Sequence, residues 1–153
     1  MGEIKTLPNG LQYSRDFSEY DGCVVMHNDK TIKRYKELNE EKWGFDCHSC
    51  DCFFAFSAEQ FKEGLKKIRP LEKDEKLVNV GAGLYGTRDG VEKYFAKYEE
   101  IDKKIKQECD PQEVYFYEYN NHECMISWDG DAEPYKIIVS IWGVDVANSI
   151  VRL

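Results

Sequence analysis

The stretch VNVGAGLYGTRDGVEKYF (residues 78–95) bears directly on the fold, because it spaces three glycines as G-x-G-x-x-G: Gly81, Gly83 and Gly86. In a dinucleotide-binding fold such glycines join a buried strand to a helix, and an acidic residue about 20 positions later ends the next strand. Here Asn79 interrupts the strand, and Glu99 and Glu100 fall within the following helical pattern. We therefore expect no dinucleotide cofactor, and we interpret the glycines as a tight link between a short strand and the longest helix.

A small anionic ligand, such as a nucleotide, is a weaker prediction for the same segment. A glycine loop before a helix N-terminus exposes backbone N–H groups that can hold an anion. We predict the following ligand-binding residues from this loop and from a later polar segment: Gly81, Gly83, Gly86, Thr87, Arg88, Asn121, His122 and Glu123. The alternative is that the glycines only permit tight turns or close backbone packing.

Length and composition predict one globular domain over residues 1–153. The chain has 153 residues, of which 42% are hydrophobic and 14% aromatic, and this content is too high for a disordered chain. No apolar run approaches the roughly 20 residues that span a bilayer, and the N-terminus has no apolar signal region. We expect a cytoplasmic protein without a membrane partner, in the host cytoplasm if a phage encodes it.

The charge is concentrated in the last third of the chain. The net charge is −8, and residues 107–153 carry nine acidic and two basic side chains. Binding of a nucleic-acid backbone needs clustered lysine and arginine, so we expect none. An acidic surface favours a basic protein partner, and we predict three partner-binding residues: Asp129, Asp131 and Glu133. The alternative is that the charge serves solubility alone.

The hydrophobic pattern predicts alternating short strands and helices. Asn9-Gly10 indicates a β-hairpin, and CVVM (23–26) a strand. A helix should carry Ile32, Tyr35 and Leu38 on its buried face. The run CFFAFSAEQFKEGLKKI (52–68) predicts a buried strand followed by a helix, because Ser57 and Gln60 have the spacing of a capping box.

The second half of the chain predicts a long helix, a hairpin and two short helices. A strand at 77–80 precedes a helix over 88–108. After Pro111, EVYFYEY and CMISW alternate with period two, which favours two antiparallel strands. A helix starting near Asp131 should end at Gly143, with a last short helix behind it. The expected fold is α+β: a small, mostly antiparallel sheet packed against three to four helices, with a C-terminal β-hairpin followed by two short helices.

The cysteines and histidines leave two chemical alternatives open. Zinc takes four nitrogen or sulfur ligands, and one such set could come from two short motifs: Cys47, Cys50, His122 and Cys124. His122 and Glu123 could instead serve as a base and its orienting acid, although neighbouring strand residues point to opposite faces. No G-x-S-x-G, H-E-x-x-H or P-loop sequence occurs. We expect no cofactor and no bound metal, with the cysteines as small core residues.

Three segments together resemble a known but uncharacterised family: FFAFSAEQFKEGLKKI, GAGLYG and YEYNNHECMISWDGD, within residues 52–142. It comprises small acidic proteins found in bacterial genomes and in phages or prophages. The resemblance marks seven pattern positions: Phe56, Gln60, Phe61, Gly64, Asn121, His122 and Glu123. It implies no catalytic residue, because the family has no known activity, and it leaves residues 1–50 as a less certain extension.

The sequence thus predicts a binding or inhibitor protein in preference to an enzyme. It would engage a host protein, such as a component of host defence, through its acidic surface, or it would sequester a small anionic ligand. This setting follows from the resemblance to proteins of phages and mobile elements. The alternatives are a small enzyme that uses His122 and Glu123, and an interaction module stabilised by zinc.

Overall fold

The structure is a computed structural model and describes residues 2–18 and 22–153. These residues form six α-helices, one 3-10 helix and two three-stranded antiparallel sheets, so the predicted α+β class is confirmed. The chain divides into two compact units: unit 1 is residues 1–39 with 102–153, and unit 2 is residues 40–101. The prediction of a single domain over the whole chain stays a prediction. Within the described residues, no helix is both long and apolar enough to cross a membrane.

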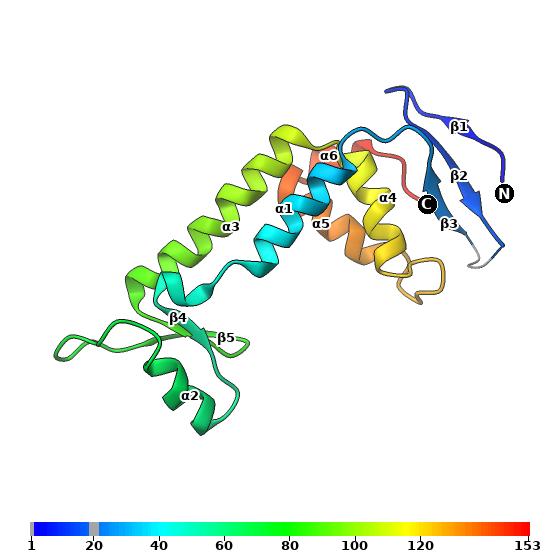
Figure 1. The fold of residues 1–153 in the computed structure, drawn as a ribbon. Coiled ribbons are helices and arrows are strands. Elements are labelled where there is room, and N and C mark those ends of the chain that lie inside the picture. Colours follow the sequence, from blue (N-terminus) through cyan, green and yellow to red (C-terminus); the bar gives the residue numbers. More distant parts are fainter. Residues whose placement is uncertain (1, 19–21) are drawn as a thin grey trace. The chain divides into compact units, whose positions relative to one another are not determined.

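Two helices contain the boundary between the units: α1 (Ile32–Gly44) and α3 (Arg88–Glu108) (Figure 1). Both were predicted, and α3 has the predicted bounds. Ile32, Tyr35 and Leu38 are buried as the apolar spacing of α1 requires.

Unit 1 begins with the predicted hairpin and ends with three helices. The sheet has the order β1-β2-β3, formed by Lys5–Thr6, Gln12–Asp16 and Cys23–Met26. Gly10 has a φ of 92°, a conformation that glycine adopts without strain, so the chain can turn back between β1 and β2. The helices are α4 (Pro111–Asn121), α5 (Ala132–Trp142) and α6 (Val144–Ser149). The last two match the predicted pair of short helices.

Unit 2 places a small sheet between two helices. Its elements after α1 are the 3-10 helix η1 (Cys47–Cys50), β4 (Cys52–Phe54), α2 (Ala58–Leu65), β5 (Val78–Gly81) and β6 (Leu84–Gly86). The sheet order is β4-β6-β5. Phe53 and Tyr85 pair across β4 and β6 and pack with Phe61 of α2, while Cys52 and Leu84 pack with Tyr94 of α3. The capping box is confirmed, because the Gln60 N–H donates to Ser57 Oγ at 3.2 Å.

The glycine-rich segment is a β-hairpin, so its interpretation as a link between a strand and the longest helix was wrong. Gly81 pairs with Leu84, and the two residues between them, Ala82 and Gly83, have φ values of 52° and 82°. Positive φ at both central residues is the geometry of a tight two-residue hairpin turn. The short strand β6 lies between this turn and α3, and the sequence pattern did not separate it from the glycines.

The predicted C-terminal hairpin over EVYFYEY and CMISW is also wrong. The first segment lies in helix α4, and the second lies in the turns that follow it. Asp110 precedes α4 and accepts the Gln112 N–H at 2.8 Å, and Pro111 occupies the first helical turn, which are strong helix-start signals. The apolar and aromatic residues of α4 are buried around most of the helix, so its sequence shows no helical period.

Gly64→Ala tests the close approach between α2 and β4. A methyl group at Gly64 would overlap the ring of Phe53, which is buried beneath α2. We expect a loss of about 1 to 3 kcal/mol in unfolding free energy, although alanine is the better helix former. The control is Gly44→Ala in α1, where nothing lies within 4 Å of the added carbon. Chemical denaturation that found Gly64→Ala as stable as Gly44→Ala would contradict this packing.

Candidate functional site

The candidate site is the connection between α4 and α5, residues 122–131, which we call the Trp128 loop (Figure 1). It contains most of the predicted site residues of unit 1. Its geometry depends on α4, which precedes it, and on the C-terminal segment, which contacts α4.

Helix α4 carries two buried acidic side chains. Glu113 Oε1 accepts three hydrogen bonds from the start of α1: from the N–H of Lys30 at 3.0 Å, and from the N–H and hydroxyl of Thr31 at 2.8 and 3.1 Å. Thr31 Oγ1 in turn accepts the Asp110 N–H at 2.9 Å, so the N-termini of α1 and α4 cap each other. A buried acid is tolerated only when its oxygen atoms have such partners.

Glu118 is 2% exposed and lies one helical turn before His122. The Tyr35 hydroxyl donates to Glu118 Oε1 at 2.9 Å, and His122 Nε2 lies 3.1 Å from Glu118 Oε2. Burial, and then the charge of Glu118, raise the pKa of the Tyr35 hydroxyl, so this phenol stays a hydrogen-bond donor. The acid that orients His122 is therefore Glu118 and not the predicted Glu123, which is exposed with a φ of 51°.

The Trp128 loop has a defined backbone. The N–H groups of His122 and Cys124 donate to the carbonyls of Glu118 and Tyr119 at 2.9 and 3.1 Å, which continues the last turn of α4. Cys124 is buried, and burial raises the pKa of its thiol to about 11, so it acts as a small core residue at the base of the loop.

Two large apolar side chains project from this loop. Trp128 is 97% exposed and Ile126 is 71% exposed. The backbone beneath them is closed by two turns, in which Ile126 N–H donates to Glu123 O at 3.0 Å and Gly130 N–H donates to Ser127 O at 3.3 Å. The Ser127 hydroxyl also hydrogen-bonds Asp129. A tryptophan held in water by an ordered turn is a typical binding side chain.

The far end of the loop is fixed by Asp131. Its carboxylate accepts two hydrogen bonds of 2.7 Å from the Arg152 guanidinium and one of 2.7 Å from the Tyr115 hydroxyl of α4. The Arg152 guanidinium holds the pKa of Asp131 below its usual value, although burial opposes this. The Leu153 N–H donates to the same Tyr115 hydroxyl, and the Arg152 guanidinium lies over the Tyr135 ring at 4.1 Å. Asp131 therefore joins the loop to the C-terminal segment.

The three predicted partner-binding acids have different roles in the structure. Asp131 forms an ion pair with Arg152 of the same chain. Asp129 and Glu133 are exposed, and both lie near Trp128 in the sequence. Glu133 lies 3.4 Å from Lys136 Nζ, an exposed pair that contributes little stability. The predicted acidic set thus has fewer free members than expected, and the exposed apolar side chains of the same loop were not predicted from the sequence.

The predicted anion site in unit 2 has fewer open donors than expected. Gly81 and Gly83 form the hairpin turn described above, and Gly86 packs against Cys52. The Thr87 N–H donates to Asp51 O at 3.2 Å, and Thr87 Oγ1 accepts the Gly90 N–H at 3.0 Å, before the exposed Arg88 begins α3. The backbone N–H groups of Thr87 and Gly90 already have acceptors, so fewer donors are left for an anion. Ligand binding at this segment stays a prediction.

The four predicted zinc ligands belong to different units. Cys47 and Cys50 lie in η1 of unit 2, and His122 and Cys124 lie in unit 1. Among the described residues, the side chains of metal-ligating type that come together are instead Asp46, Cys47 and His48. Zinc binding by the predicted set stays a prediction.

Sequence reasoning missed Glu118, Tyr35, Ile126, Trp128 and Arg152. One usable signal was the i, i+4 spacing of Glu118 and His122, which places both on one face of a helix, but the segment was assigned to a strand. The exposure of Trp128 had no local signal, because tryptophan is buried in most proteins.

We expect Glu118→Ala to lower the unfolding free energy by about 3 kcal/mol, because it leaves the buried Tyr35 hydroxyl without its acceptor. A double-mutant cycle with Tyr35→Phe, measured by urea denaturation, isolates this contact. The cost of Tyr35→Phe should fall in the Glu118→Ala background. Strictly additive losses would show that the two side chains do not interact.

We expect Asp131→Asn to make stability less sensitive to acid. The pKa of Asp131 is lowered in the folded protein, so its stabilising contribution is complete above the unfolded pKa of about 3.9 and is lost as the pH falls through the folded value. Below about pH 4, unfolding free energies should therefore decline less steeply for Asp131→Asn than for the wild type, and Arg152→Gln should show a smaller change in the same direction, because the Tyr115 hydroxyl still lowers the pKa of Asp131. Parallel declines in all three proteins would refute the pairing.

A family model matches residues 34–133, which is more than half of the chain, and its description is a family of unknown function, DUF7659. The matched region contains Tyr35, Glu118, His122 and the whole Trp128 loop. The chain matches no curated protein and no solved structure. An uncharacterised family was expected from the motifs of residues 52–142, and this chain belongs to the DUF7659 family.

Proposed function

We propose that this chain is a non-enzymatic binding protein that engages a protein partner through the Trp128 loop. The observation that carries the proposal is the 97% exposure of Trp128 on a loop whose two ends are hydrogen-bonded to α4. Tryptophan is among the residues that contribute most to the free energy of protein association.

The ordered backbone favours tight binding. Association loses free energy when a flexible loop must be ordered, and this loss is small for a loop that already has its bound shape. Here the turns at Glu123–Ile126 and Ser127–Gly130, together with the Asp131 contacts, hold Trp128 and Ile126 in place. Burial of both side chains removes a large apolar area from water, and this would drive association.

The exposed acids of the Trp128 loop and of the start of α5 favour a basic partner. Glu123, Asp129 and Glu133 are exposed, whereas Asp131 is paired with Arg152. A partner that fits this surface has an apolar pocket for the indole ring and lysine or arginine side chains at its rim. These exposed acids would raise the association rate and make it depend on salt, and the indole would supply most of the affinity.

The family resemblance supports a host protein as the partner. The resemblance described above is to proteins of bacteria and of phages or prophages, and in such a setting we propose that the partner is a protein of the host cell. We propose that binding inhibits or titrates a component of host defence. This part of the proposal follows from that setting.

Trp128→Ser should abolish partner capture without loss of stability, because a side chain 97% exposed contributes almost no packing. The measurement is affinity capture from a bacterial lysate, followed by a binding titration with the purified partner. We expect the affinity to fall by a factor of about 30 or more, which corresponds to a hot-spot loss of at least about 2 kcal/mol.

The matched control is Trp43→Ser, which removes an exposed tryptophan of unit 2. It should leave capture unchanged, and Asp129→Lys with Glu133→Lys should slow association and reduce its dependence on salt. A partner that binds wild type and Trp128→Ser equally well would refute the proposal. Asp131 is left intact, because its substitution would disturb the loop itself.

A further inference from the structure

The segment Asp46-Cys47-His48 of unit 2 brings three metal-ligating side chains together outside the Trp128 loop. Each side chain offers one potential ligand atom, and these three atoms lie within 4.8 Å of one another. They are a carboxylate oxygen of Asp46, the sulfur of Cys47 and a ring nitrogen of His48. Asp46 Oδ1 and His48 Nδ1 are 3.0 Å apart. The side chain of His48 is about one third exposed and Cys47 is partly exposed, so an ion can reach them from solvent.

We propose that Asp46, Cys47 and His48 bind one transition-metal ion of the zinc type, with a fourth coordination position open to solvent. Carboxylate oxygen, thiolate sulfur and imidazole nitrogen are the three side-chain ligand types that zinc uses, at about 2.0 to 2.3 Å from the ion. Ligand atoms around one tetrahedral zinc are therefore about 3.3 to 3.7 Å apart. The three atoms lie within 4.8 Å of one another, so side-chain rotations without a change of the backbone could bring them to this spacing.

The backbone that carries the ligands is held from both sides. Asp46 accepts the His48 N–H through its side chain at 3.0 Å, and its carbonyl accepts the Ser49 N–H at 3.1 Å and the Ser49 hydroxyl at 2.6 Å. These contacts hold Asp46 as the N-cap of the 3-10 helix that begins with Cys47 and His48, so the three consecutive side chains lie on one tight turn.

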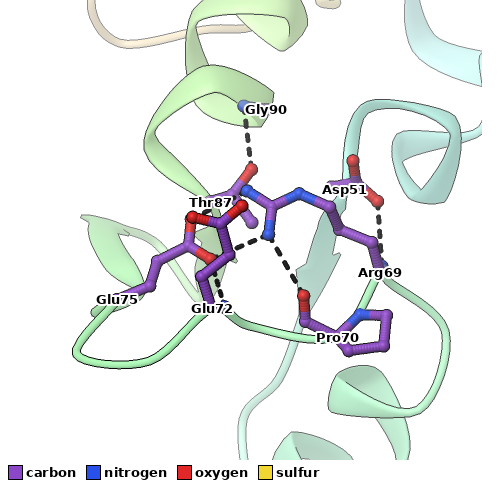
Figure 2. A network of polar contacts seen from close by, with 7 residues as sticks. All are labelled: Asp51, Arg69, Pro70, Glu72, Glu75, Thr87 and Gly90. Carbon is purple, nitrogen blue, oxygen red and sulfur yellow. Dashed lines mark hydrogen bonds and ion pairs between the residues drawn. The ribbon is translucent and has the colours of Figure 1, made fainter.

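A polar network fixes the residue that ends this turn (Figure 2). Asp51 has a φ of 52°, and its carboxylate accepts the Arg69 N–H at 3.0 Å. The Arg69 guanidinium binds both oxygen atoms of Glu75 at 2.7 and 2.8 Å, and this holds the pKa of Glu75 at about 2. Gly90 of α3 permits close approach, because a methyl group there would overlap the Cys50 carbonyl.

A cavity of about 470 Å³ lies beside two of the ligands. It is lined by Cys47 and His48, by Phe53 and Phe54 of the edge strand β4, and by residues of α2 and the turn after it. Sites with three protein ligands and one open position are the kind in which zinc binds water or a further molecule, and this cavity has the volume of a small-ligand site. Zinc binds the thiolate form of cysteine, so an ion bound here would displace the proton of the Cys47 thiol.

The test is a Co²⁺ titration of the full chain under reducing conditions, followed by displacement with Zn²⁺. We expect one Co²⁺ per chain, with the near-ultraviolet absorption band that a cobalt–thiolate bond produces. Cys47→Ser should remove this band, and His48→Ala should weaken binding about tenfold or more. The matched control is Cys23→Ser, which removes a partly exposed cysteine of unit 1 and should leave the band unchanged.

Asp46→Asn keeps the test informative if either of the other variants fails to fold. Asparagine caps a helix as well as aspartate does, but it lacks the charge that binds the metal. Circular dichroism should therefore show an unchanged fold, and the affinity for Co²⁺ should fall about tenfold. A wild-type chain that binds no stoichiometric Co²⁺ would overturn the proposal, as would a thiolate band that persists in Cys47→Ser.

Discussion

The burial of helix α4 is the constraint on which the rest of unit 1 depends. The helix buries side chains around most of its circumference, including the acids Glu113 and Glu118, which must be hydrogen-bonded to be tolerated inside a protein. Glu113 accepts hydrogen bonds from the residues that precede α1. Glu118 accepts a hydrogen bond from Tyr35 of α1 and pairs with His122. Because each acid has partners on a distant segment, α4 fixes the position of α1 and the start of the following loop.

The Trp128 loop is ordered because both of its ends are hydrogen-bonded to α4. Its first residues continue the hydrogen-bonding pattern of α4, and its last residue, Asp131, is held by Tyr115 of α4 and by Arg152. An apolar side chain kept in water by such an arrangement costs free energy in the isolated protein. A partner that buries Trp128 would recover this free energy, and this is the role that we propose for the arrangement. The metal site that we propose in unit 2 has its own supports, which are the turn at η1 and the contact between Asp51 and Arg69.

The elements that the sequence predicted correctly have strong local signals. Ser57 with Gln60 marks the start of α2, Asn9-Gly10 marks the first hairpin, and the apolar stripe of α3 has an unbroken helical period. Helix α4 was missed because the burial of most of its circumference removes the period and because its aromatic residues favour strands. The candidate site was predicted only in part: His122 and the acids were found, whereas Trp128 and the pairing of His122 with Glu118 depend on the three-dimensional fold.

The most direct test of the account is amide hydrogen exchange of the free chain and of its complex with the captured partner. In the free chain, amides of α4 should exchange slowly, and those of residues 125–129 should exchange faster than the amides of α4, because turns at the surface open more readily than a buried helix. We predict that the partner slows amide exchange in residues 122–131 and leaves the exchange rates of α2 and the β5–β6 hairpin unchanged. Protection that appears on unit 2, with no change in residues 122–131, would contradict the claim that the Trp128 loop is the binding surface.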